Sequence, residues 1–432
     1  MIKISFYACL LVLFLVSCGE QPTQAEAEAE AEAEAEAEAT TQEAAPKINS
    51  KHYVEHSKAN AQTFGKGNNT FGVNFYKQLA KGKEGQNLLF SPVSLHLGLG
   101  MLYLGATEEG KKELEKVLAL QNLENPANDY ANFQKSQCAY IANALCASNK
   151  NDFQLKKGYQ KKIEENFDAK FFVGDLSSPA FSREINEWIS KSTKNHIKEA
   201  TGVLSEKAGL VLISSIFFED AWKEGNDFDG TKTKPDAFFV SPQARVAMPF
   251  MNKNEGFAGH FAHEKFQMVS LQHQYSRSSF YVILPDENVP LAEIEEMMTP
   301  QNLQAWIDST SNKEIERLSI PKMSVDNDIS AKEVLKAMGA KAIFDNMDAR
   351  NFNEIANKPL FVGNIKQKTH LAIDEQGTTA ASYTTTETRP TESKAPRNNK
   401  VNMLVNRPFI FFVYSKDNKS ILFLGRFVRP TR

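Results

Sequence analysis

Apolar residues follow two patterns between about residue 60 and the C-terminus. Residues 95–104, which follow Ser91-Pro92, are rich in leucine and predict a buried helix with Ser91 as N-cap and Pro92 at the first helical position. Residues 181–197 also repeat apolar positions at helical spacing. Short runs of β-branched and aromatic residues predict strands at 210–213, 280–284, 409–414 and 421–425. A short polar stretch separates the last two runs, which therefore predict a β-hairpin.

The composition indicates one large folded body. The chain has 432 residues, of which 41% are hydrophobic and 24% charged, as in globular proteins. Helical and strand patterns mix without a strict βαβ alternation, which predicts the α+β class. No second linker interrupts the chain before about residue 390, so we expect a single domain over residues 60–432.

The first residues have the layout of a secretory signal. Lys3 precedes an apolar stretch at 4–16 that is too short to span a membrane and remain there. Leu15-Val16-Ser17-Cys18 is similar to the bacterial lipobox, which predicts a lipoprotein signal peptide over 1–17 and acylation of Cys18. Acyl chains at Cys18 would anchor the protein to a membrane. The alternative is an ordinary signal peptide cleaved at another position.

Residues 18–59 are predicted to form a disordered spacer. Ala-Glu is repeated seven times over 25–38, within a tract rich in Gln, Thr and Pro. Each Glu of the repeat up to Glu34 meets another Glu four residues later, so repulsion between like charges opposes a helix. A charged linker is extended, and we expect it to hold the folded body away from the membrane. The predicted location is the bacterial envelope, lipid-anchored and exposed at the cell surface.

Charge and motifs exclude several classes of function. The formal charge is −3, with 50 basic and 53 acidic residues, so nothing indicates a nucleic-acid partner. The sequence lacks Gly-x-Ser-x-Gly, His-Glu-x-x-His, the phosphate-binding glycine loop and Cys-x-x-Cys, and we expect neither an enzyme nor a cofactor. His52 with His56 and His260 with His263 could share a helix face, but no third ligand type lies nearby, and we expect no metal site.

The folded body contains two cysteines, Cys138 and Cys146. If residues 139–147 form one strand, the two sulfur atoms lie roughly 26 Å apart at about 3.3 Å per residue, too far for a disulfide. We expect two free, buried thiols.

Ordered motifs along the chain resemble those of the serpin family from about residue 60 onward. They are Asn87-Leu88-Leu89-Phe90-Ser91-Pro92-Val93-Ser94, Ile141-Ala142-Asn143-Ala144-Leu145, Ile216-Phe217-Phe218-Glu219-Asp220-Ala221-Trp222, Ser319-Ile320-Pro321-Lys322-Met323, Asn406-Arg407-Pro408-Phe409 and Phe423-Leu424-Gly425-Arg426. The resemblance implies three mixed, mainly antiparallel sheets surrounded by eight to nine helices, with an exposed reactive-centre loop at about 377–400. It also implies a monomeric inhibitor whose partner is a target protease.

The segment that begins at His370 is similar to the strand and hinge that lead into a serpin reactive loop. The hinge residues implied are Glu375, Gly377, Thr378, Thr379, Ala380, Ala381 and Ser382. In the family mechanism a serine protease, or a cysteine protease, attacks the loop and forms an acyl-enzyme. The cleaved loop then inserts into the central sheet. The alternative is a non-inhibitory serpin that serves as a surface binding or adhesion module.

The alternation of side chains along the loop agrees with insertion as a strand. An inserted strand sends alternate side chains to opposite faces of a sheet. The residues of one parity are all small, namely Thr378, Ala380, Ser382, Thr384, Thr386 and Thr388, whereas Tyr383, Glu387 and Arg389 have the other parity. Threonine also favours strands, so the loop is suited to become one.

The scissile bond is less well defined by the sequence. The usual family spacing from Gly377 places it at Thr391-Glu392, whereas counting back from Pro408 permits Lys394-Ala395 or Arg397-Asn398. Arg389 is followed by Pro390, which most trypsin-like enzymes reject.

Five further residues are implied to control opening of the sheet. They are Ser91, Ser94, Ser214, Trp222 and Gln367. Serpins usually carry asparagine and histidine where this chain aligns Ser214 and Gln367. Because Gln supplies both a donor and an acceptor, we expect the paired change to preserve a hydrogen-bond network.

Overall fold

Nine α-helices lie in the described part of the chain. The computed structural model describes residues 55–120, 125–150, 153–206, 208–345, 352–378 and 400–430, within the unit Val54–Arg432. The helices in this part are α3 (Glu55–Ala80), α4 (Pro92–Gly105), α5 (Glu108–Val117), α6 (Pro126–Lys135), α7 (Lys157–Phe167), α8 (Pro179–Ser192), α9 (Leu291–Met297), α10 (Pro300–Asp308) and α11 (Lys332–Met338). None of these helices is long and apolar enough to cross a membrane. Short 3₁₀ turns lie at Gly230–Lys232 and Ala342–Phe344.

Seven strands of the described part of the chain form the central sheet. Their order is β3 (Lys170–Gly174), β2 (Tyr140–Ser148), β4 (Leu210–Phe217), β13 (Val362–Ile373), β14 (Gly377–Thr378) and β5 (Asp220–Ala221), with β12 (Met323–Ser330) also paired to β13. Strands β4 and β13 are parallel neighbours, whereas β2 is antiparallel to β4 and β12 is antiparallel to β13. The sheet is therefore mixed, as the resemblance implied.

The other ten strands that the structure describes are joined into one hydrogen-bonded network. Its order is β1 (Leu88–Phe90), β17 (Ser420–Phe427), β16 (Phe409–Ser415), β10 (Ser278–Pro285), β9 (Phe266–Gln272), β8 (Phe257–His263), β11 (Ser311–Pro321), β7 (Ala244–Lys253) and β6 (Lys234–Ser241), with β15 (Val401–Leu404) on β11. Strand β11 pairs with β8 through Ser311–Glu314 and with β7 through Leu318–Pro321. Its length joins the second and third expected sheets into a continuous ladder.

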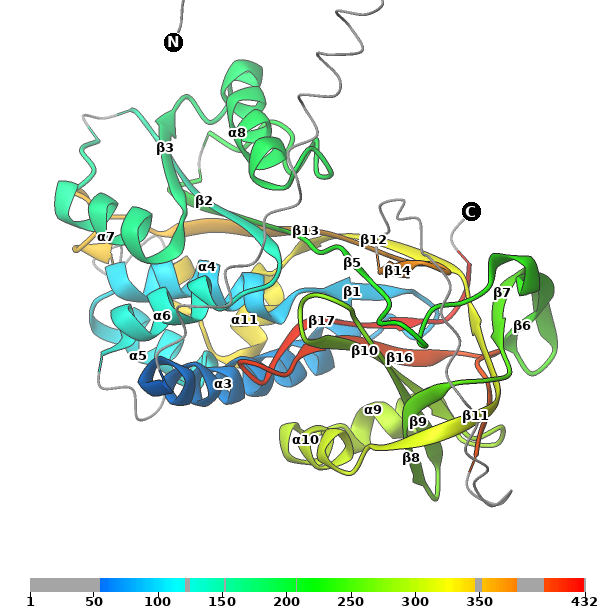
Figure 1. Cartoon of the computed structure of the whole chain (residues 1–432). Coiled ribbons are helices and arrows are strands. Elements are labelled where there is room, and N and C mark those ends of the chain that lie inside the picture. The colour runs from blue at the N-terminus through cyan, green and yellow to red at the C-terminus, as the bar shows by residue number, and fades with distance from the viewer. Residues whose placement is uncertain are drawn as a thin grey trace, which may run out of the picture. The chain divides into compact units, whose positions relative to one another are not determined.

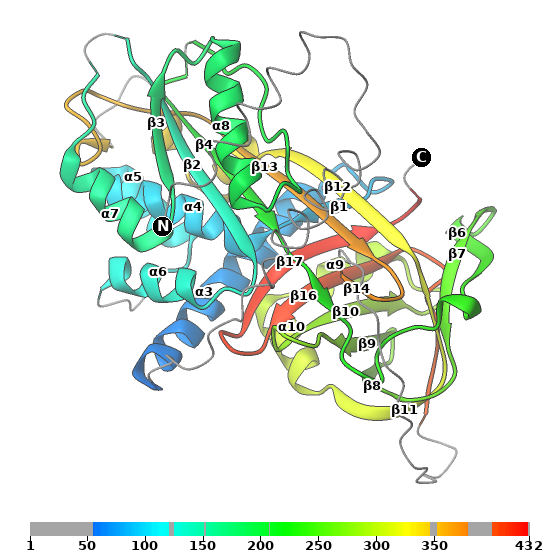
Figure 2. The same cartoon turned by 45° about the horizontal axis from the view of Figure 1, so that its top comes forward.

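Helices cover both faces of the central sheet. Helix α8 lies over one face and α4 beneath the other, as Figures 1 and 2 show. The alternation of β4 explains this arrangement, because Val211 and Ile213 pack in the cluster under α8 while Leu210 and Leu212 face the main core. In α4 there is no room for a side chain at Gly100, where a Cβ would lie 2.3 Å from the ring of Tyr130.

The predicted elements are confirmed, with small differences at their ends. Ser91 caps α4 by accepting a hydrogen bond from the Ser94 N–H, and Pro92 is the first helical residue. The hairpin at the C-terminus is β16–β17. Helix α8 ends at Ser192 rather than at residue 197, because Lys194 and Asn195 take positive φ angles of 48° and 62°.

The expectation for the cysteines was wrong in one detail. Both thiols are free, but only Cys146 is buried, because the Cys138 residue is partly exposed to solvent. Burial raises the pKa of both thiols, that of Cys138 to about 12. His260 and His263 lie on strand β8, so they do not share a helix face. Within the described residues, no three His, Cys, Asp or Glu side chains are arranged to hold a metal ion.

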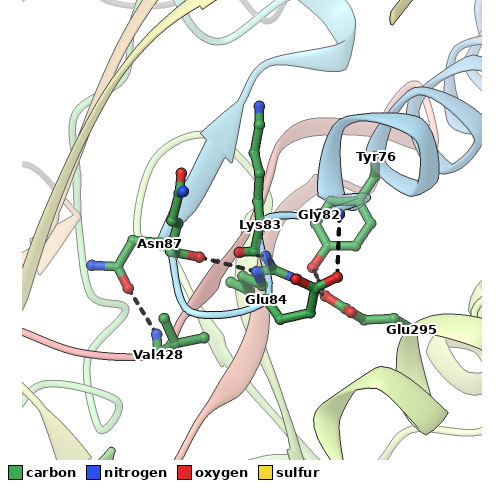
Figure 3. Close-up of polar contacts among 9 residues, drawn as sticks. Tyr76, Gly82, Lys83, Glu84, Asn87, Glu295 and Val428 are labelled. Carbon is green, nitrogen blue, oxygen red and sulfur yellow. Dashed lines mark hydrogen bonds and ion pairs between the residues drawn. The ribbon is translucent and has the colours of Figure 1, made fainter.

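A buried charge cluster ties the C-terminal strand to the N-terminal helix. Arg426 on β17 is 1% exposed and donates to Glu295 of α9 (2.8 Å), which also accepts from the Tyr76 hydroxyl (2.6 Å) (Figure 3). The guanidinium donates further to the carbonyls of Lys83 and Gln86, so the buried charge is fully paired. Burial, together with the nearby Glu295 carboxylate, raises the pKa of Tyr76. This cluster fixes one end of the β1–β17 pair beneath the central sheet.

Candidate functional site

The site is built around the seam, the ladder between parallel strands β4 and β13. Its register runs from Val362 opposite Leu210 to Thr369 opposite Ile216, so the seam is closed along this length. Beyond Thr369 the strands diverge, and β13 continues as far as Ile373. A further strand can enter the central sheet here only by separating β4 from β13.

The first turn of α4 is hydrogen-bonded to both strands of the seam. Gln367 on β13 accepts from the Ser91 N–H (3.0 Å) and donates to the Ser91 carbonyl (2.9 Å). Ser214 on β4, the register partner of Gln367, lies 2.5 Å from the Ser94 hydroxyl. All four residues are buried, with 0% exposure. The expected network therefore exists, and one helical turn links the two strands that insertion would separate.

Asn143 on β2 joins the same network. Its side-chain amide donates to the Ser94 carbonyl (3.2 Å), and its Oδ1 is buried without a partner among the described residues. A buried polar atom without a partner costs free energy. Ser94 is thus held from β2 as well as from β4.

At the upper end of the seam, the first hinge residues already form a strand. β14 pairs with β13 through Thr378 and Ile373, and with β5 through Gly377 and Ala221. Because β5 directly follows β4 in the chain, β14 occupies the opening between the two diverging strands. Trp222 closes this end: its backbone N–H donates to the Gln376 carbonyl (2.8 Å) and its indole N–H to the Asp374 carbonyl (2.9 Å).

Glu375 anchors the turn between β13 and β14. Its carboxylate accepts from the Lys322 ammonium (2.7 Å) and from the Thr233 hydroxyl (2.8 Å). Burial alone would raise the pKa of Glu375, but these hydrogen bonds outweigh burial and lower the pKa below its usual range. The turn is therefore tied to Lys322, the residue between β11 and β12, and to the segment before β6.

Gly377 is required by the close approach of β14 to β5. A Cβ at this position would lie 2.2 Å from the Asp220 carbonyl oxygen and 2.9 Å from the Ala221 Cα. Both are backbone atoms, so a larger residue would displace the hinge strand rather than a side chain.

The structure brings together the predicted site residues that it describes, in two groups. Ser91, Ser94, Ser214 and Gln367 form the lower group, and Trp222, Glu375, Gly377 and Thr378 form the upper group. The other predicted site residues lie outside the described part of the chain: Cys18, Thr379, Ala380, Ala381, Ser382, Thr391, Glu392, Lys394, Ala395 and Arg397.

Sequence reasoning missed three residues of the site. Asn143 and Lys322 stood in quoted motifs, but nothing in the sequence pointed them toward Ser94 or Glu375. His273 was not singled out, although its Nε2 lies 2.7 Å from the Thr378 hydroxyl. His273 directly follows β9, between half-buried Gln272 and exposed Gln274, so the local sequence carried no signal that the imidazole is buried.

Known proteins resemble the chain over most of its length. The family model described as Serpin (serine protease inhibitor) matches residues 66–430. Human neuroserpin is 27% identical over 378 residues, which cover 83% of this chain and 90% of neuroserpin. Mouse antithrombin-III is 26% identical over 408 residues, which cover 90% of this chain and 85% of antithrombin-III.

Solved structures share the fold at lower identity. Mouse protein-Z-dependent protease inhibitor superposes with a TM-score of 0.76 at 23% identity, covering 88% of this chain and 100% of that one. Human thyroxine-binding globulin, solved in complex with its hormone, superposes with a TM-score of 0.74 at 22% identity, covering 86% of this chain and 100% of that one. The family match, the fold and the arrangement of strand and hinge agree, and the chain belongs to the serpin family of protease inhibitors.

Proposed function

We propose that this protein is an inhibitory serpin that traps serine proteases, or cysteine proteases, by inserting its cleaved loop into the central sheet. The observation that carries the proposal is the position of β14. It pairs on both edges, with β13 and with β5, and continues in line with the seam. Every residue added after Thr378 would extend β14 between β4 and β13, and the alternating small side chains through Thr388 suit that path.

The proposed chemistry belongs to the target protease. Its nucleophilic hydroxyl or thiol adds to the carbonyl carbon of Thr391, and the Thr391–Glu392 bond breaks as the Glu392 nitrogen accepts a proton. The products are an acyl-enzyme ester or thioester and a new N-terminus at Glu392. Insertion then carries the attached protease away before water can hydrolyse the ester.

The first experiment is incubation with a panel of serine and cysteine proteases. We expect an SDS-stable complex and a C-terminal fragment that begins at Glu392. A fragment that begins at Ala395 or Asn398 would move the scissile bond to one of the two alternatives. Cleavage without a covalent complex across the panel would contradict the inhibitory mechanism.

The second candidate function is that of a non-inhibitory serpin that serves as a surface binding or adhesion module, called here a display module; human thyroxine-binding globulin, which shares the fold, was solved with a bound ligand. Loop cleavage distinguishes the candidates. Insertion adds a strand to the sheet and should raise the melting temperature strongly, whereas a display module should melt at the same temperature before and after cleavage.

We further propose that the inhibitor is a monomer held on the bacterial envelope by acylation of Cys18, with residues 18–59 as spacer. Metabolic labelling with a radioactive fatty acid should mark the wild-type protein and not the Cys18→Ala variant. Label that persists in Cys18→Ala would refute the anchor without affecting the proposed inhibition.

A further inference from the structure

A buried chain of hydrogen bonds starts at Thr378, the first residue after Gly377. The Thr378 hydroxyl lies 2.7 Å from Nε2 of His273, and Nδ1 of His273 lies 2.8 Å from the Ser278 hydroxyl. The Ser278 hydroxyl lies 2.7 Å from that of Ser276, which hydrogen-bonds the Asp220 carboxylate. We refer to these five side chains as the hinge relay. All of them are buried, with exposures between 0% and 7%.

The carboxylate at the far end fixes the direction of the relay. Burial raises the pKa of Asp220, although hydrogen bonds from Ser276 and Tyr275 oppose this shift. In its ionised form the carboxylate only accepts hydrogen bonds, so Ser276 donates to Asp220 and in turn accepts from Ser278. Ser278 then accepts from Nδ1–H of His273, which leaves Nε2 as an acceptor. Thr378 must therefore donate its hydroxyl hydrogen to His273. The backbone N–H groups of Tyr275 and Ser276 (3.1 and 2.8 Å) also donate to Asp220 and hold it in place.

The surroundings of His273 favour its neutral form. Its ring stacks on Trp222 with centroids 5.1 Å apart and an interplanar angle of 10°, and it meets Phe218 edge-on at 5.2 Å. Burial lowers the pKa of His273 to about 3.

Among the described residues, the titratable groups around the relay form no direct ion pair with His273. Asp220 on β5 is separated from it by two serines, and the Cys138 thiol beside Ser276 is kept protonated by burial. In the turn before β14, Glu375 is already paired with Lys322. β10 contributes Ser278, which is uncharged.

We propose that His273 is a positioning residue that holds Thr378 in the sheet and so keeps the start of the reactive loop inserted at neutral pH. The neutral imidazole needs a donor at Nε2, and Thr378 provides one only while β14 is in place. When the hinge leaves the sheet, water reaches the ring and its pKa returns toward 6.5. Protons therefore bind the released hinge more tightly than the inserted one, and acid favours release.

We call the hydrogen bond between His273 and Thr378 the latch. Hydrogen exchange tests the latch on the full chain without any protease. At pH 7.5 the amides of 374–378 should be protected in wild type, and Thr378→Val, which keeps shape but removes the donor, should exchange about fivefold faster. Thr378→Ser keeps the hydroxyl and should retain the wild-type protection. Rates are corrected for the intrinsic pH dependence of exchange.

Acidification supplies the second readout. Between pH 7.5 and pH 5 the corrected protection of 374–378 should fall by up to roughly 30-fold in wild type, as follows from a pKa that changes between about 3 and 6.5. In His273→Gln this pH dependence should disappear. Equal protection in Thr378→Val and Thr378→Ser, or a pH dependence that persists in His273→Gln, would overturn the latch.

The effect of the latch on protease trapping rests on the proposed function. With a protease that forms the covalent complex, Thr378→Val should yield more cleaved, untrapped inhibitor than Thr378→Ser, because insertion no longer starts from a paired strand. If no protease forms a complex with any variant, the proposed function fails, while the exchange data still decide the latch.

Discussion

Removing the Gln367 amide should loosen the seam from below. In Gln367→Ala, the buried Ser91 N–H loses its acceptor at 3.0 Å, whereas the Ser91 carbonyl loses one donor at 2.9 Å and keeps the other, the Leu95 N–H (3.2 Å). A buried group left unpaired costs about 1–3 kcal/mol, so we expect a loss of roughly 2 kcal/mol in the free energy of unfolding. Unfolding entropy of about 2.1 cal/mol/K per residue, summed over the roughly 380 residues of Val54–Arg432, converts that loss into a Tm about 2.5 °C lower.

The matched control is Gln160→Ala. Gln160 lies on α7, and its amide donates to Glu164 on an exposed face (2.9 Å), a contact worth only a few tenths of a kcal/mol. Scanning calorimetry at pH 7.5 should separate the two variants clearly. Sheet opening should also become easier, so Gln367→Ala should accept an added peptide of residues 378–391 into the central sheet faster than the control. Equal Tm values for the two variants would refute the idea that Gln367 ties the seam to α4.

Three further predictions concern the hinge and the core. Gly377→Val should expel β14 from the sheet, because the Cβ of the new side chain would overlap the backbone of β5. Hydrogen exchange of the amides of 374–378 should then accelerate. The control is Gly85→Ala, where nothing lies within 4 Å of the added Cβ, and it should leave that exchange unchanged. Lys322→Ala should destabilise the protein by about 1 kcal/mol at pH 7, because the pair with Glu375 is partly exposed, and a double-mutant cycle with Glu375→Gln should recover most of that value as coupling. Burial lowers the pKa of His96 to about 4, so as the pH falls below 6.5 the unfolded chain binds a proton at His96 before the folded chain does. The free energy of unfolding should therefore fall by about 2 kcal/mol between pH 7 and pH 5. His96→Gln should abolish this part of the pH dependence of Tm.

Local patterns were sufficient to predict the main elements of the fold. Helix α4 follows from an N-cap serine and a proline in front of a leucine-rich run, and the β16–β17 hairpin follows from two apolar runs around a polar turn. The end of α8 was not predictable, because two non-glycine residues there take positive φ angles. The junction made by β11 was missed for another reason: pairing of one strand with two sheets depends on register, which the sequence of a single strand does not reveal.

The candidate site was predicted only where a motif or a simple chemical rule applied. Gln367 was expected to keep the network intact because an amide has both a donor and an acceptor, and its two bonds to Ser91 confirm this. The contact between His273 and Thr378 joins residues 105 positions apart, and no composition or periodicity predicts such a pair. Its tautomer depends in turn on Asp220, three hydrogen bonds away.

The two groups of the site act on the same seam from opposite ends, and this makes opening cooperative. Below, the bonds from Ser91 and Ser94 favour the closed pair of Gln367 and Ser214. Above, the strand that would open the seam is already paired, so extension from Thr378 replaces each lost β4–β13 backbone bond with a new one. The net cost of opening the seam as far as Gln367 is then the loss of the lower network rather than of the ladder itself. We therefore expect that weakening the lower network speeds insertion, whereas weakening the hinge relay slows its start, and that Gln367→Ala and Thr378→Val change the rate of insertion in opposite directions. Changes in the same direction would show that the two groups do not act on one seam.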